Sequence, residues 1–277
     1  MSNAIINTKY EHFNPVLDKV HILLDDAKNE FINNQNNRKW KKIIVSLMFR
    51  LYEQFDSVHL LAKNDRIIDS SIIYRSLYNL EVLIQYLLID PSKKTEEYIS
   101  QSNTLLTQIQ RKISEKKSFF FLMLEDIYKL DNNLSSLNKK KKFRQKSIKQ
   151  MAEEAGLIAD YEFAYWLLSN IEHSNVSSIF ELKGLPGLDL VSKSSDFPYF
   201  IQFLVLNSSI ISVIRTTEKC SNVMKFKKYI QFDYYWNEYS NTLSNILGVN
   251  FKIDNTHPDK LRFYDTKLNI LKEYSRT

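Results

Sequence analysis

The sequence of 277 residues contains few of the residues that break helices and shape tight turns. It has 4 glycines, 5 prolines and 1 cysteine. Sandwiches, barrels and phosphate-cradling folds need glycine-rich turns, so this scarcity argues against them. The single cysteine, Cys220, excludes a disulfide framework and a cysteine-based zinc site. The remaining composition is 44% hydrophobic, 25% charged and 13% aromatic, which is typical of a globular protein with a substantial core.

Long hydrophobic runs are also absent. The most apolar stretch, residues 199–214, contains Gln202, Asn207 and three serines. A membrane-spanning helix needs about 20 mostly apolar residues, so we expect no span and no membrane partner. The first 13 residues lack a basic region followed by an apolar stretch. We therefore expect no signal peptide and a cytoplasmic location.

Motifs for metal binding and for common catalytic loops are missing. The five histidines form neither an H-E-x-x-H pair nor a Glu-x-x-His pair. The chain has no G-x-x-x-x-G-K-[ST], G-x-G-x-x-G or G-x-S-x-G segment. Cys220 has no histidine near it in the sequence, so we expect it to be inert. The sequence predicts neither a metal site nor a cofactor.

Apolar residues recur at helical spacing along nearly the whole chain. We therefore predict an all-α bundle with long helices, at least six helices in total, and no sheet of three or more strands. It forms a single domain over residues 1–277, with a helical C-terminal extension at 229–277. The predicted helices cover residues 14–33, 40–62, 65–90, 92 onward, 147–155, 160–175, 198–219, a segment after 229, and 261–274.

Local signals indicate where several helices begin and end. Asn14-Pro15 is typical of a helix start, and Pro91 is expected to end the preceding helix. Ser147 and Gln150 have capping-box spacing, and Gly156 is the expected stop. Asp160 is predicted to cap the next helix. The helix over 65–90 is apolar on most sides and is predicted to be central.

The positive charge is concentrated in one segment. Residues 139–149 read KKKKFRQKSIK, with seven basic residues and no acid, whereas the whole chain has a formal net charge of +6. The rest of the chain is therefore close to neutral. Such a cluster attracts phosphate backbones, although a solvated lysine-rich loop is the simpler interpretation. The candidate nucleic-acid-binding residues are Lys139, Lys140, Lys141, Lys142, Arg144 and Lys146.

Polar side chains form a stripe on the predicted helix after Asp160. Four polar residues recur at every fourth position, so they lie along one helix face and shift gradually around it. They are Tyr161, Tyr165, Ser169 and His173. Buried polar groups need hydrogen-bond partners, which makes this pattern unusual for a core face. The stripe is either a functional site or a structural network that fixes helix register.

The helix over 65–90 contains a possible counterpart to this stripe. Arg75 lies in an apolar segment, where an unpaired guanidinium is costly, so it needs an acceptor or a polar cleft. Asn79 is one turn further on the same face, and Glu81 lies further round. We predict that the two helices pack together with Arg75 within reach of the stripe. A structural arginine–carboxylate pair is the alternative.

Three segments carry a family resemblance. They are SIIYRSLYNLEVLIQYLL at 71–88, SIKQMAEEAGL at 147–157 and Y-x3-Y-x3-S-x3-H at 161–173. The pattern, over about residues 40–215, resembles a widespread bacterial family of all-helical proteins of unknown function. That family usually has an acidic residue one turn after the arginine, where this chain has Asn79. The family is distantly similar to HEPN-type bundles, many of which are toxins or antiviral effectors that cut RNA without metal.

Two hypotheses follow. In the first, which the resemblance implies, the chain is a metal-independent RNA-cleaving or RNA-binding effector of a bacterial toxin or antiphage defence system. His173 would be the general acid or base, Arg75 would stabilise the phosphorane, and Ser169 and Tyr165 would orient the groups. Tyr161 and Asn79 complete the candidate site. Its expected partners are RNA, a second copy of the chain or a defence-system protein. In the second hypothesis, the chain is a non-catalytic helical binding or scaffold protein.

Overall fold

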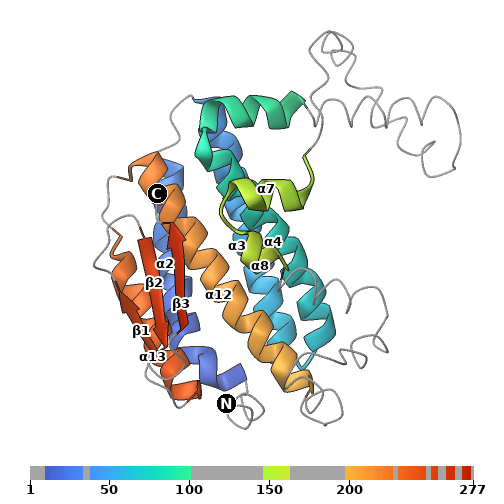
Figure 1. The fold of residues 1–277 in the computed structure, drawn as a ribbon, viewed down its shortest axis with the longest axis vertical. Coiled ribbons are helices and arrows are strands. Elements are labelled where there is room, and N and C mark those ends of the chain that lie inside the picture. Colours follow the sequence, from blue (N-terminus) through green and yellow to red (C-terminus); the bar gives the residue numbers. More distant parts are fainter. Residues whose placement is uncertain are drawn as a thin grey trace, which may run out of the picture.

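The computed structural model describes residues 10–33, 38–100, 146–162, 197–226, 230–247, 251–254, 260–265 and 270–275. Within them the chain is a bundle of mostly long helices, so the predicted all-α bundle is confirmed (Figure 1). The helical elements are η1 (Tyr10–Phe13), α2 (Asn14–Asn33), α3 (Lys39–Lys63), α4 (Ile67–Ile89), α7 (Ile148–Glu154), α8 (Ile158–Asp160), α12 (Phe197–Met224) and α13 (Phe232–Leu247). Residues 91–100 are also helical.

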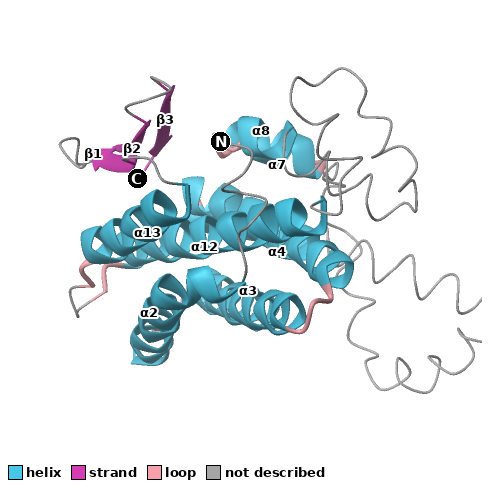
Figure 2. Cartoon of the chain, turned by 90° about the horizontal axis from the view of Figure 1, so that it is seen from below, coloured by secondary structure: helices cyan, strands magenta, loops and turns pink. Residues whose placement is uncertain are grey.

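The long helices pack in two layers, with a smaller third layer on top. Figure 2 shows α4, α12 and α13 side by side, with α2 and α3 beneath them and α7 and α8 on the opposite side of α4. The core between the layers is aromatic-rich, and Trp236, Tyr52 and Phe55 are fully buried in it. Helix α12 packs against α2, α3, α4 and α13, and residues 212–220 are buried without interruption. Thus α12 shares the central position that the sequence predicted for α4 alone.

Several predicted helix ends agree with the structure. Helix α2 begins at Asn14 with Pro15 in its first turn, and α4 ends at Ile89, two residues before Pro91. The capping box is present, because the Gln150 backbone N–H donates to Ser147 Oγ at 3.2 Å and the Ser147 N–H donates to Gln150 Oε1 at 3.0 Å. Gly156 has a φ of +74°, a conformation that glycine adopts without steric cost.

One predicted cap is wrong. Asp160 does not precede the helix after Gly156, because α8 begins at Ile158 after Leu157 and Asp160 is its last residue. The Asp160 carboxylate accepts a hydrogen bond from the guanidinium of Arg215 instead. A long-range charged partner competes here with the backbone N–H groups that a cap would satisfy.

The C-terminal segment forms a sheet instead of the predicted helix. Strands β1 (Phe251–Asp254), β2 (Lys260–Asp265) and β3 (Ile270–Ser275) make an antiparallel sheet in the order β1-β2-β3. Phe263 pairs with Ile253 on one side and with Lys272 on the other. The predictions of a helix over 261–274 and of no three-stranded sheet are therefore wrong. The sheet lies beside α13 at the edge of the bundle (Figure 1).

No helix among the described residues is both long and apolar enough to cross a membrane. This agrees with the polar residues that interrupt α12. Gln202, Ser209 and Thr216 are buried along this helix and make hydrogen bonds inside the protein.

Candidate functional site

A buried arginine connects three helices. Arg215 of α12 donates from Nε to Glu81 Oε1 of α4 at 2.8 Å, and its Nη2 lies 2.6 Å from the same oxygen. Its Nη1 donates to Asp160 Oδ2 of α8 at 2.8 Å. The side chains of Arg215 and Glu81 are 6% and 0% exposed, whereas that of Asp160 is 19% exposed. One guanidinium thus fixes α8 and α4 to the central helix.

Burial affects the ionisation of the acidic groups in this cluster. Burial raises the pKa of Glu81, and the guanidinium of Arg215 acts in the opposite direction. Burial and the nearby Glu81 carboxylate also raise the pKa of Tyr74 and of Tyr78. Both phenols therefore stay protonated, and Tyr78 Oη donates to the carbonyl oxygen of Leu157 at 3.1 Å. This bond ties the segment before α8 to α4.

The structure describes three of the six predicted catalytic residues. Arg75 and Asn79 lie half-buried on α4, and Tyr161 is half-buried against the core directly after α8. Tyr165, Ser169 and His173 lie outside the described residues. The start of the stripe segment is fixed near α4, while the approach of Arg75 to His173 stays a prediction.

The arginine–carboxylate pair on α4 uses a residue that the sequence reasoning missed. Glu81 pairs with Arg215 of α12. Arg215 directly follows an apolar segment and is the first residue of the polar run RTTEKC. An arginine inside an otherwise apolar helix was the signal that could have identified it, as it identified Arg75.

A pocket lies on the other side of α4. Its volume is about 230 Å³, and it is bounded by α3, α4, the helix over 91–100 and α7. Its polar lining consists of Arg50, Ser76, Asn79 and Tyr98, and its apolar lining of Leu80, Leu83, Ile148 and Met151. Asn79, which the sequence analysis placed in the candidate site, therefore faces this pocket.

Two amides, Asn79 on α4 and Gln54 on α3, have oxygens without a hydrogen bond among the described residues. Gln54 donates from Nε2 to Ser76 Oγ at 2.8 Å. Gln54 Oε1 and Asn79 Oδ1 are buried and have no hydrogen-bond partner among the residues that the structure describes. Most buried polar atoms in native proteins have such a partner, and of these two residues Asn79 is the one that lines the pocket.

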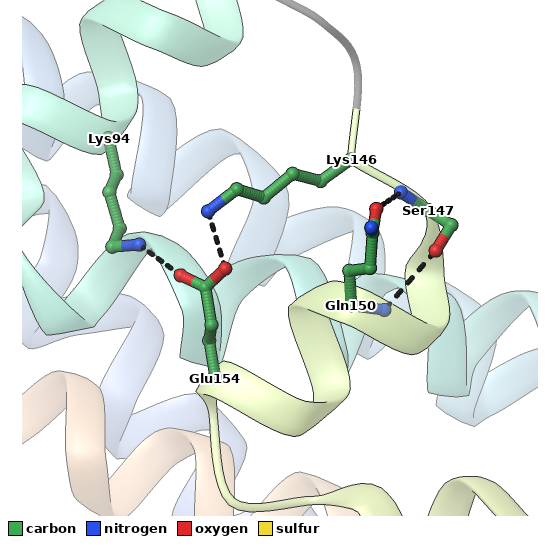
Figure 3. Close-up of polar contacts among 5 residues, drawn as sticks. All are labelled: Lys94, Lys146, Ser147, Gln150 and Glu154. Atoms are coloured by element: carbon green, nitrogen blue, oxygen red, sulfur yellow. Dashed lines mark hydrogen bonds and ion pairs between the residues drawn. The ribbon is translucent and has the colours of Figure 1, made fainter.

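Glu154 holds two lysines at the end of α7 (Figure 3). Lys94 Nζ donates to Glu154 Oε2 at 2.9 Å, and Lys146 Nζ donates to Oε1. Hydrogen bonds from Lys146 and then Lys94 lower the pKa of Glu154. The two ammonium groups lie 3.7 Å (Lys94) and 5.2 Å (Lys146) from the ring centroid of buried Tyr86. We call Lys94, Lys146, Glu154 and Tyr86 the lysine clamp.

The lysine clamp fixes the end of the basic segment. Lys146 is the one predicted nucleic-acid-binding residue that the structure describes, and Lys139–Lys142 and Arg144 lie outside the described residues. Lys146 is thereby held against α4 and α7, two residues before Ile148, which lines the pocket.

Other buried polar groups of α12 serve packing. Tyr52 Oη lies 3.0 Å from Thr217 Oγ1, and Trp236 Nε1 donates to Glu218 Oε2 at 2.9 Å. Cys220 is buried, which raises the pKa of its thiol and agrees with the expected inertness. Within the described part of the chain, no three histidine, cysteine or acidic side chains are grouped to hold a metal ion.

The fold and these contacts define an all-helical bundle built around a buried arginine–carboxylate network. Residues 41–184 match the model of a family of unknown function (DUF5677), and the chain belongs to this family. The matched region includes all but the first two residues of α3, together with α4, α7 and α8, but not Arg215. No curated protein and no solved structure matches the chain.

Proposed function

We propose that this chain is an RNA-binding effector that cleaves RNA without a metal ion, of the HEPN-like kind found in bacterial toxin and antiphage defence systems. One observation carries the proposal. The Arg215 bridge between Glu81 and Asp160 holds α8 against α4, and α8 leads directly into the Tyr/Ser/His stripe. The segment that begins the stripe is thereby fixed against the helix that carries Arg75.

The proposed chemistry needs no cofactor. The ribose 2′ oxygen bonds to the adjacent phosphorus as the bond from phosphorus to the 5′ oxygen breaks. His173 accepts the proton of the 2′-hydroxyl as general base and returns it to the leaving 5′ oxygen as general acid. Arg75 stabilises the charge of the phosphorane, and Ser169 and Tyr165 orient the reacting groups. An imidazole titrates near neutral pH, so it suits both proton transfers. The products carry a 2′,3′-cyclic phosphate and a 5′-hydroxyl.

The basic segment supplies the affinity in this proposal. Lys139–Lys142, Arg144 and Lys146 attract the phosphate backbone irrespective of sequence. The lysine clamp supports this arrangement, because it holds the last of these residues at a defined place on the bundle. RNA affinity should then fall steeply with salt, and replacing the four lysines at 139–142 by glutamine should reduce the salt dependence.

The test is an RNA-cleavage assay with the full chain in the presence of EDTA. Wild type is expected to cut end-labelled single-stranded RNA and leave DNA of the same sequence intact, because DNA lacks the 2′-hydroxyl. His173→Ala and Arg75→Ala are expected to lose cleavage while they keep the melting temperature of wild type. A wild type that neither binds nor cuts any RNA, together with a destabilised His173→Ala protein, would contradict the proposal.

A second candidate is a non-catalytic helical scaffold. It is favoured by the burial of the Arg215 network, since Glu81 is fully enclosed and Arg215 nearly so. Such networks fix helix register without chemistry. Under this hypothesis His173→Ala orphans buried partners and lowers the melting temperature, whereas the enzyme hypothesis predicts no such loss.

A further inference from the structure

We propose that the pocket between α3, α4, the helix over 91–100 and α7 binds a small organic acid, in which a carboxylate is joined to an apolar body about the size of one ring. This inference goes beyond the proposed function and does not depend on it, because the ligand is a free small molecule and not RNA. It follows from the charge around the pocket, from the hydrogen-bond donors in its wall and from its apolar lining.

The charge around the pocket is positive. Arg50 of α3 lines the pocket, is exposed, and has no ion-pair partner among the described residues. No acidic side chain is present in the part of the lining that the structure describes. The lysine clamp beside the pocket adds positive charge, because its two ammonium groups share the single carboxylate of Glu154 (Figure 3). Coulomb attraction therefore favours a ligand with a negative group.

Hydrogen-bond donors without acceptors lie in the polar part of the wall. Ser76 Oγ accepts from Gln54 Nε2 at 2.8 Å, and its own hydroxyl hydrogen has no acceptor among the described residues. The Asn79 amide oxygen is enclosed, so this amide can offer only its Nδ2 donor to the pocket. Arg50 adds its guanidinium from the neighbouring helix. A carboxylate suits such donors, because hydrogen bonds to an ionised acceptor are about twice as strong as neutral ones.

The rest of the lining is apolar and limits the size of the ligand. It consists of Leu80, Leu83, Ile148 and Met151, next to Tyr98. The volume of the pocket is about 230 Å³. A cavity of about 150 Å³ holds one benzene molecule, whereas pockets for drug-sized ligands begin at about 300 Å³. One ring with a carboxylate therefore fits, which makes benzoate a suitable probe and benzamide its uncharged counterpart of the same shape.

The wall formed by α7 is held in place without a ligand. Glu154 at its end binds Lys94 and Lys146, and the carbonyl oxygen of Leu157 beyond it accepts from Tyr78 Oη at 3.1 Å. These contacts tie α7 and the segment after it to α4 and to the helix over 91–100. A ligand then does not have to order this wall when it binds, which lowers the cost of binding.

The experiment titrates the ¹⁵N-labelled full chain with benzoate at neutral pH and follows the amide chemical shifts. Low salt is used, because an exposed guanidinium is screened by ions. Benzoate is expected to shift amides within residues 76–83 and 148–151, which carry much of the lining. It should bind roughly tenfold more tightly than benzamide, the gain from one charge-assisted hydrogen bond. Arg50→Gln, which removes the charge and keeps a side-chain amide donor, should bring this ratio close to one.

Two further variants test the location of the site. Arg38→Gln makes the same replacement at an exposed arginine roughly 18 Å further along the axis of α3 and should leave the ratio unchanged. Ile148→Trp should weaken the binding of both probes, because the larger side chain fills part of the pocket. The inference would be overturned by an absence of benzoate binding, by shifts confined to other residues, by equal affinity for the two probes, or by an unchanged ratio in Arg50→Gln. Each of these results leaves the proposed RNA cleavage to its own assay.

Discussion

The guanidinium of Arg215 contacts the buried carboxylate of Glu81 through two nitrogens, at 2.8 Å from Nε and 2.6 Å from Nη2. Both side chains are almost completely removed from water, so each charge depends on the other for compensation. The pair joins α12 to α4 across the centre of the bundle. Its removal should therefore affect the whole fold.

Arg215→Met is expected to lower the free energy of unfolding by about 3–5 kcal/mol, because it leaves Glu81 buried without its counterion. Urea denaturation at neutral pH measures the loss. The double variant Arg215→Met/Glu81→Leu should recover part of it, since the fully buried Glu81 carboxylate is then gone and only Asp160, whose side chain is 19% exposed, has lost its contact with Arg215.

Arg66→Met is the matched control for this prediction. Arg66 pairs with Asp69 at the surface, and exposed pairs contribute little to stability. If Arg215→Met cost no more than Arg66→Met, the buried pair would not have the structural role described here.

His59 should make the protein less stable in mild acid. Its ring is buried, and its Nε2 lies 3.3 Å from Ser209 Oγ, which itself donates to the Leu206 carbonyl oxygen. Burial, with a smaller effect of nearby His21, lowers the pKa of His59 from 6.5 to about 3. In mild acid the unfolded chain therefore binds a proton at His59 that the folded protein does not bind. The contribution of neutral His59 to the free energy of unfolding is complete above pH 6.5 and is lost as the pH falls toward 3.

Between pH 7 and pH 5, His59 is expected to lower the free energy of unfolding by about 2 kcal/mol. This follows from a loss of roughly 1.4 kcal/mol for each pH unit below 6.5. Urea denaturation at the two pH values measures it. His59→Gln should reduce the difference by that amount, because glutamine does not titrate. His12→Gln, at an exposed position on η1, should not change it, and an equal effect of both variants would argue against the assignment.

The lysine clamp should control the local stability of α7. Glu154→Gln removes the charge that Lys94 and Lys146 share, so the amides of α7 are expected to exchange with solvent faster. Hydrogen–deuterium exchange measures this. The lysines lower the pKa of Glu154 below its ordinary value of 4.5. In wild type the stabilisation by the lysine clamp is therefore complete above pH 4.5 and weakens as the pH falls below it.

Glu153→Gln changes the same charge on the neighbouring, exposed residue and should leave exchange in α7 at the wild-type rate. The effect of Glu154→Gln should also become smaller in high salt, because partly exposed ion pairs are screened. Identical exchange in the two variants would show that the clamp does not stabilise α7.

The sequence by itself determined most of the helix boundaries. The Asn14-Pro15 start, the end of α4 before Pro91 and the capping box at Ser147 depend on groups within a few residues of each other. Their hydrogen bonds and steric limits are local, so the order of residues is enough to predict them. Helical periodicity likewise predicted the apolar faces of α2 and α3.

Three features were decided by the tertiary structure alone. They are the arginine that is buried in an ion pair, the central position of α12 in the bundle, and the fold of the C-terminal segment. Arg75 and Arg215 both stand in apolar helices, and only the packing of α12 against α4 selects Arg215 as the partner of Glu81. The strands at 251–275 obtain their hydrogen bonds from each other across the sheet, as in the pairing of Phe263 with Ile253. Arg215 and Glu81 are distant along the chain. The strand partners are closer, but short apolar segments fit a helix or a strand equally well until those partners are in place.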